Sequence, residues 1–201
     1  MKKSTVFEET CQQYLAQIRQ VDFLAKAEIL GVNRDKDRLI IPLYDRIYSL
    51  SAEGLSEKGG GKITPAVQVM IYKYILTCGS NKPAMRDKMV TYREFKDSGP
   101  LISYFTTNTN KTLESTFSGN IELLKERSQK RGGELLTSDM YDLSIRFYAF
   151  PKIPVVINFN DSDELFPSKS SVLYRSTAEH YLDMECLAMT GTLLVGKLIS
   201  S

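Results

Sequence analysis

The chain has 201 residues, which is the usual length of one domain, and folding at that length buries about 70% of the surface that the unfolded chain exposes. It carries 42% hydrophobic and 25% charged residues, which is the composition of an ordinary globular protein and excludes a disordered one. The net charge of +2 is too small to indicate nucleic acid as a partner.

The first segment of the chain is predicted to be a helix that stops at Gly31. Apolar residues recur at alternating spacings of four and three over residues 7–25, which places them on one face of a helix. Two short strands are expected next, over residues 39–44 and 46–51. Pro42 restricts the first of them to a sheet edge or a bulge, because proline has no N–H to donate to a neighbouring strand.

The strongest helix signal begins at Thr64, which we expect to be the N-cap, with Pro65 at the first helical position and Gly79 at the end. Residues 80–99 show no regular pattern. A further helix is then expected to end at the glycine pair of residues 132–133, with an apolar face formed by Leu113, Phe117, Ile121 and Leu124.

The last part of the chain predicts strands followed by a helix. Residues 143–149 alternate between apolar and polar side chains, and residues 155–159 and 172–174 form short apolar runs. Asp183 can cap a final helix, and Gly191 within that helix indicates close backbone packing. The whole pattern predicts a single α+β domain over residues 1–201, with antiparallel strands packed against three or four amphipathic helices.

No membrane segment is expected. Lys2 and Lys3 are followed by polar residues rather than by the apolar core of a signal peptide. The longest apolar run, CLAMTGTLLVG, has about half of the ~20 residues that a membrane helix needs. We therefore expect a cytoplasmic protein that does not bind a membrane.

The stretch SEKGGGKIT, residues 56–64, raises the question of a phosphate-binding loop. A Walker loop needs the pattern GxxxxGK followed directly by Ser or Thr. Here Lys62 is followed by Ile63, the spacing of the glycines is wrong, and Pro65 removes a backbone donor. We interpret the segment as a connection between a strand and a helix, and we expect no nucleotide loop.

An acidic loop follows the strand over residues 155–159. Asp161, Asp163 and Glu164 lie within four positions, and carboxylates gathered at the end of a strand can bind a hard cation or act as acid and base. The pattern of a calcium loop is absent, because Phe166 stands where glycine is required. A solvated loop without a chemical role is the alternative interpretation.

His180 is the single histidine of the chain and has acidic neighbours, among them Glu185. These two residues are candidates for an acid or a base. One histidine cannot build a tri-histidine zinc site. Three scattered cysteines predict neither disulfides nor an iron–sulfur cluster and favour a reducing cytoplasm; they are Cys11, Cys78 and Cys186.

Basic residues gather over residues 82–96, with two aromatic residues between them. The basic residues are Lys82, Arg86, Lys88, Arg93 and Lys96. Such a pattern is typical of single-stranded nucleic acid binding and also of a solvated loop, and the low net charge disfavours nucleic acid. We expect Arg93 to hold a small anion, because a guanidinium binds carboxylate or phosphate in bidentate fashion, and we add Arg146 as a second candidate ligand-binding residue.

Residues 65–199 resemble the domain-of-unknown-function family numbered 3786, found in bacteria and archaea. The segments that carry the resemblance are YKYILTCG, VTYREFKDSGPLISYF, GGELLTSDMYDLSIRFYAFPKIPVVINF, DSDELFPSKSSVLY and AEHYLDMECLAM. Some relatives carry an iron–sulfur module like that of corrinoid iron–sulfur proteins, which implies an anaerobic, one-carbon or corrinoid setting for them. This chain lacks the clustered cysteines of that module, and Leu165 separates its acids from the Phe-Pro of the family pattern.

The leading hypothesis is a binding or accessory domain that recognises a small ligand or a partner protein through Arg93, Arg146, Asp161, Asp163 and Glu164. The first alternative is a metal-assisted hydrolase with Asp161, Asp163 and Glu164 as metal ligands and His180 or Glu185 as base. The second alternative is an interaction module with a purely structural role. The sequence leaves the cofactor, if any, unknown.

Overall fold

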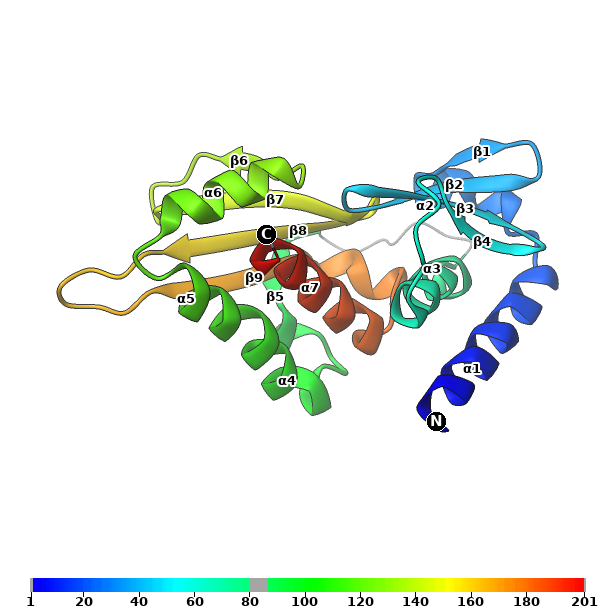
Figure 1. Cartoon of the computed structure of the whole chain (residues 1–201), viewed down its shortest axis with the longest axis horizontal. Helices are drawn as coiled ribbons and strands as arrows, with labels where there is room; N and C mark the ends of the chain where they lie inside the picture. The colour runs from blue at the N-terminus through cyan, green and yellow to red at the C-terminus, as the bar shows by residue number, and fades with distance from the viewer. Residues whose placement is uncertain (1, 80–86, 201) are drawn as a thin grey trace.

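The computed structural model describes residues 2–79 and 87–200 and shows two antiparallel sheets with helices packed on them (Figure 1). Lys82 and Arg86 of the predicted basic segment lie outside the described residues. The α+β class is therefore confirmed. None of the described helices is long and apolar enough to cross a membrane.

The first sheet is a meander of four strands in the order β1-β2-β3-β4. Its strands are β1 (Asn33–Asp35), β2 (Arg38–Leu43), β3 (Arg46–Ser51) and β4 (Gly54–Glu57). Helix α1 (Lys2–Arg19) packs against α3 (Pro65–Thr77) beside this sheet, at the right of Figure 1. The 3₁₀ turn Leu24–Lys26 and the short helix α2 (Ala27–Leu30) lead from α1 into β1.

The second sheet has five strands in the order β5-β9-β8-β7-β6. Its strands are β5 (Met89–Thr91), β6 (Glu134–Leu136), β7 (Leu143–Phe150), β8 (Ile153–Asn160) and β9 (Lys169–Arg175). Three 3₁₀ turns flank these strands and the helices, at Tyr92–Glu94, Gly99–Leu101 and Ser176–His180.

A helical layer packs on the second sheet (Figure 1). One helical run contains α4 (Ile102–Thr106), a π-helical turn (Thr107–Lys111) and α5 (Thr112–Phe117). Helix α6 (Ile121–Lys130) follows α5 and reaches the edge of the sheet, and α7 (Met184–Ile199) packs against both α4 and α5.

The two sheets share one continuous cluster of buried apolar side chains. Helix α3 contacts α7, and β2 contacts β7. The turn between β2 and β3 is fixed to the second sheet, because the N–H of Tyr44 donates to the carbonyl of Ala149 at 3.1 Å and its phenol donates to the carbonyl of Thr190 at 2.8 Å. The junction of the two sheets is thus a packed part of the fold, and it positions the pocket described below.

The predicted caps and close approaches are confirmed. Thr64 accepts a hydrogen bond from the N–H of Val67 at the start of α3, and Asp183 accepts one from the N–H of Cys186 at the start of α7. A Cβ atom added at Gly191 would lie 2.6 Å from the Tyr174 hydroxyl, so only glycine lets α7 approach the second sheet this closely.

Two expectations about element boundaries are wrong. The first helix ends at Arg19 rather than reaching Gly31, which instead closes α2 in the left-handed conformation. The helix expected around residues 113–124 is split between α5 and α6 at Gly119, which has φ +71°. The expectation for Pro42 is confirmed, because Pro42 is opposite Ile47 of β3 and lies beyond the end of β1, so it is at an edge of the sheet where no second strand needs its missing N–H.

Candidate functional site

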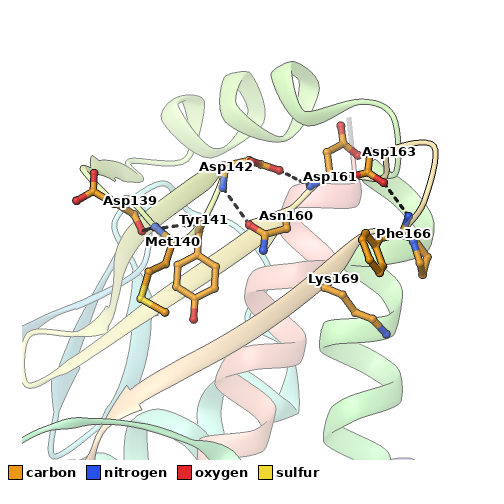
Figure 2. Close-up of a pocket in the computed structure, with 11 residues that line it drawn as sticks. Asp139, Met140, Tyr141, Asp142, Asn160, Asp161, Asp163, Phe166 and Lys169 are labelled. Atoms are coloured by element: carbon orange, nitrogen blue, oxygen red, sulfur yellow. Dashed lines mark hydrogen bonds between the residues drawn. The ribbon is translucent and has the colours of Figure 1, made fainter.

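The sequence-predicted acids lie at an open cleft of about 620 Å³, where the loop before β7 meets the loop between β8 and β9 (Figure 2). We call this hollow the acidic cleft. Asp161 and Asp163 line it, together with Asp139 and Asp142, and Lys169 is its one basic residue among the described part of the chain. Glu164 is exposed and is not among the lining residues.

The carboxylates of the acidic cleft hold the loops in place. Asp161 accepts hydrogen bonds from the N–H groups of Gly119 at 2.6 Å and Ser162 at 2.8 Å. Asp142 accepts one from the N–H of Asp161 at 2.9 Å (Figure 2). Asp163 accepts two, each at 2.7 Å, from the next residues of its own loop, Leu165 and Phe166. In Asp161 and Asp163 these bonds all fall on Oδ1, so the loops use about half of the accepting capacity of each carboxylate.

The predicted metal ligands are not assembled into a site. Asp161 and Asp163 each point Oδ1 at backbone N–H groups, and Glu164 lies apart from the cleft lining. Across residues 2–79 and 87–200, no group of three or more His, Cys, Asp or Glu side chains is placed to hold a metal ion. The geometry therefore gives the metal-assisted hydrolase no support.

The two predicted arginines lie at two other hollows. Arg146 pairs with Glu134 at 2.5 Å and stacks its guanidinium over Tyr148 at 5.7 Å, and it lines a shallow hollow of about 300 Å³ on the second sheet. Arg93 lines a separate pocket of about 220 Å³. The structure thus places Arg93, Arg146 and the acidic loop around three different hollows.

His180 and Glu185 do not form an acid–base pair in the described structure. The Nε2 atom of His180 is buried without a hydrogen-bond partner among the described residues. Glu185 is exposed in the first turn of α7. Cys186, the nearest cysteine in sequence, is buried, and burial together with the nearby Asp183 carboxylate raises the pKa of its thiol, which keeps it an unreactive neutral group at neutral pH.

A further pocket of about 710 Å³ lies between the first sheet and helices α3 and α7, next to the Tyr44 turn that joins the two sheets, and we call it the inter-sheet pocket. Its wall is largely apolar and comes from the first sheet and from two helices. The apolar residues are Leu43, Tyr48, Val67, Met70, Met189 and Leu193. Tyr48 is buried, and burial together with the charge of Glu57 raises the pKa of its phenol, so the ring presents a neutral hydroxyl.

Four basic residues from distant parts of the sequence line the inter-sheet pocket. Arg46 lies on β3, Lys62 on the glycine-rich loop before α3, Arg131 at the end of α6 and Lys197 in the last turn of α7. The loop that carries Lys62 is the segment that the sequence analysis compared with a phosphate loop. The loop lacks the Walker pattern, but its Lys62 lines the inter-sheet pocket.

The positive charge of the inter-sheet pocket exceeds its negative charge. Asp45 pairs with both Arg131 at 3.1 Å and Lys197 at 2.6 Å, and Glu57 pairs with Arg46 at 3.0 Å. Lys62 has no ion pair with any described residue. Four cations facing two carboxylates leave a local net charge of +2.

The cations beside Asp45 lower the pKa of its carboxyl group. Its burial alone would raise the pKa of its carboxyl group, but the hydrogen bonds and charges of Lys197 and Arg131 outweigh that effect. The pKa of Asp45 is consequently below its ordinary value. One carboxylate shared by two cations leaves both of them able to bind a further anion.

Of this pocket, the sequence alone indicates only the loop that carries Lys62. Arg46 and Lys197 are far apart in sequence, and only the pairing of β2 with β3 and the packing of α7 bring them together. The single available signal was the position of Lys62 between three glycines and a helix start, because such a loop exposes its side chains in front of the helix.

Comparison with known proteins gives one match. A family model described as Domain of unknown function (DUF3786) matches residues 22–197. The match covers most of the chain and begins well before residue 65, where the resemblance found in the sequence starts. No curated protein and no solved structure matches the chain.

Proposed function

The chain belongs to this DUF3786 family, and since the family description assigns no reaction, we propose a function from the geometry of the inter-sheet pocket. The protein is a binding domain that holds a small organic anion with an apolar body. The anionic group lies among the basic side chains, and the apolar body lies against Val67, Met70 and Met189.

One observation carries this proposal. Four cations converge on an apolar wall, and only two carboxylates oppose them. Small-molecule sites are concave, mostly apolar and have a few convergent polar groups, with volumes of about 300–1,000 Å³. A volume of about 710 Å³ lies inside that range.

The composition of the pocket narrows the class of ligand. The apolar wall favours a ligand with a hydrocarbon body over a free inorganic ion. The arginines favour carboxylate or phosphate as the charged group, because a guanidinium forms paired hydrogen bonds with both. Since the structure shows no assembled set of catalytic groups within its described residues, we infer binding rather than catalysis.

We place this binding domain in the cytoplasm as an accessory protein. The setting implied by relatives that carry an iron–sulfur module, anaerobic one-carbon or corrinoid-linked metabolism, is where we would first look for the natural ligand. A partner protein that delivers or receives this ligand is part of the same proposal.

Thermal unfolding of the full chain at low ionic strength tests the proposal. The panel contains aliphatic and aromatic monocarboxylates and organic phosphates. A ligand at 100 times its dissociation constant adds about 2.7 kcal/mol to the free energy of unfolding, which raises the midpoint by a few degrees in a chain of this size.

Two lysines of one loop provide a matched pair of variants. Lys62→Glu places a negative charge at the pocket, whereas Lys58→Glu makes the same change at an exposed residue that does not line it. We expect the ligand-induced shift to be retained in Lys58→Glu and strongly reduced in Lys62→Glu. The proposal is contradicted if no ligand of the panel raises the unfolding midpoint, or if a ligand raises it equally in both variants.

A further inference from the structure

The small pocket beside Arg93 has the chemistry of a second binding site. It has a volume of about 220 Å³ and lies between the 3₁₀ turn Tyr92–Glu94 and the helical run that contains α4 and the π-helical turn. Its apolar side is made by Ile102, Val172 and two aromatic rings, Tyr92 and Phe105. These two rings stack with their centroids 4.4 Å apart, which gives the pocket a rigid wall.

The π-helical turn explains the run of short polar residues TTNTNKT. A π-helix bonds each N–H to the carbonyl five residues back and leaves nearby carbonyls poorly matched. Here polar side chains donate to them. Asn108 donates to the carbonyl of Tyr104 at 2.8 Å, Thr109 to that of Phe105 at 2.5 Å, and Ser170 to that of Asn110 at 3.0 Å.

Asn110 also lines this pocket. Its side-chain amide lies 3.0 Å from the hydroxyl of Thr109, but the one hydrogen of that hydroxyl goes to the carbonyl of Phe105 at 2.5 Å, so Thr109 does not hold the amide in one orientation. The Nδ2 group of Asn110 makes no hydrogen bond to any described residue. The amide can therefore turn its Nδ2 group toward a ligand in the pocket.

Two more polar groups at this pocket are unused within the described chain. The guanidinium of Arg93 and the hydroxyl of Thr106 make no hydrogen bond or ion pair. The nearest acid in sequence, Glu94, is held elsewhere: it accepts from the N–H and the hydroxyl of Thr91 at 2.9 and 3.0 Å. Hydrogen-bond donors thus predominate at the pocket, and one of them, the guanidinium of Arg93, is positively charged.

We propose that Arg93, Asn110 and Thr106 form a second site, separate from the inter-sheet pocket, for a short organic carboxylate. The guanidinium binds the carboxylate, the amide and the hydroxyl donate to its oxygens, and a small apolar body rests on Tyr92 and Phe105. A volume of about 220 Å³ is below the usual range of about 300–1,000 Å³ for ligand pockets, which restricts the ligand to a single small ring or a short chain.

Nuclear magnetic resonance of the ¹⁵N-labelled full chain tests this site with benzoate as the probe. We expect benzoate to shift the amide signals of residues 91–93 and 106–111. Inorganic phosphate provides the second arm, because it carries the charge without the apolar body. Phosphate should bind more weakly at the same signals.

The variants are chosen to separate a specific site from general attraction to positive charge. Arg93→Ala should weaken benzoate binding at least tenfold, and Arg93→Lys should restore only part of it, because lysine keeps the charge but loses the paired donors. Lys96→Ala removes a nearby exposed charge that does not line the pocket and should bind as the wild type does. Lys62→Glu at the inter-sheet pocket should leave these signals unchanged, so the two sites can fail independently.

Three results would overturn the proposal: no shift of these signals with benzoate, shifts of equal size in Arg93→Ala, or phosphate binding as tight as that of benzoate. Arg93 is exposed, so its variants are expected to fold. The dispersion of the amide spectrum checks this directly.

Discussion

The acidic cleft and the inter-sheet pocket have similar volumes, about 620 and 710 Å³, and opposite charge. They also differ in how far their charged groups are already engaged in hydrogen bonds and ion pairs within the fold. In the acidic cleft, Asp161 and Asp163 each accept two backbone hydrogen bonds, one of them from Gly119 and the others from their own loop. In the inter-sheet pocket, two cations share Asp45, and Lys62 has no ionic partner in the described chain. Three of the four carboxylates that line the first hollow hold its loops, whereas the second hollow has a cation without an ionic partner among the described residues.

This difference shows that a hollow with many charged residues is not for that reason a ligand-binding site. A cluster of acids in sequence attracts notice because carboxylates bind metals and move protons. The same carboxylates also cap turns and satisfy loop N–H groups, and here most of the cleft carboxylates do so. Unused hydrogen-bonding capacity over an apolar wall is the better indicator of a ligand site in this molecule.

The largest expected effect concerns the packing of α7, which lines the inter-sheet pocket, against the second sheet. A Cβ atom at Gly191 would lie 2.6 Å from the Tyr174 hydroxyl and 2.7 Å from a ring carbon of Phe105. Gly191→Ala should therefore lower the free energy of unfolding by about 1–3 kcal/mol, as overpacking does, measured by urea denaturation.

Gly196→Ala on the same helix is the matched control. A Cβ atom there meets nothing within 4 Å, so alanine should stabilise the chain by about 0.5–1 kcal/mol through its higher helix propensity. Equal stability of the two variants would show that α7 does not pack as closely as described, and the geometry of the inter-sheet pocket would then be in question.

A smaller effect is expected from the acidic cleft itself. Asp161→Ala removes the acceptor of two backbone N–H groups and should lower the free energy of unfolding by about 1 kcal/mol, a value reduced because the side chain is partly exposed. Asp139→Ala should change it by less than about 0.5 kcal/mol, because Asp139 lines the cleft without a hydrogen bond from its own side chain to the described residues.

The Asp161→Ala variant also tests whether the acidic cleft binds no ligand. Asp161→Ala should leave any ligand-induced stabilisation at the inter-sheet pocket unchanged. A divalent metal that stabilises the wild type but not Asp161→Ala would show that the cleft binds a ligand after all and would restore the metal-assisted hydrolase.

The smallest expected effect is the pH dependence due to Asp45. Its pKa is lower in the folded chain than its ordinary value, because Lys197 and Arg131 outweigh the effect of burial. A lowered pKa means that the carboxylate stabilises the fold above its unfolded pKa of about 3.9, and this contribution is lost as the pH falls through the folded pKa. Asp45→Asn should therefore flatten the loss of stability in acid, measured by thermal unfolding between about pH 6 and pH 3.

Much of the fold could be predicted because its signals are local. Thr64 and Asp183 cap their helices through bonds to residues three positions away. The alternation over residues 143–149 identified β7, which is one strand of the larger sheet. The break at Gly119 was missed because the apolar spacing continues across it from α5 into α6, whereas the backbone does not.

The inter-sheet pocket could not be predicted because its parts meet only through tertiary packing. Arg46, Arg131 and Lys197 each read as an ordinary surface charge within its own element. Asp45, which pairs with two of them, lies in the hairpin turn between β2 and β3, where an acidic residue is common and indicates no binding site. By contrast, Arg93 was recognised as a candidate for anion binding, although its partners Thr106 and Asn110 were not.

The most direct test of the central claim is calorimetric titration of octanoate into three forms of the full chain. Asp45→Asn frees Lys197 and Arg131 from their shared carboxylate, so we expect it to bind octanoate several-fold more tightly than the wild type. Lys62→Glu should bind at least tenfold more weakly than the wild type, and raising the salt concentration should weaken all three. Equal affinities for the three forms, or no binding by any of them, would contradict the claim that spare positive charge makes the inter-sheet pocket a ligand site.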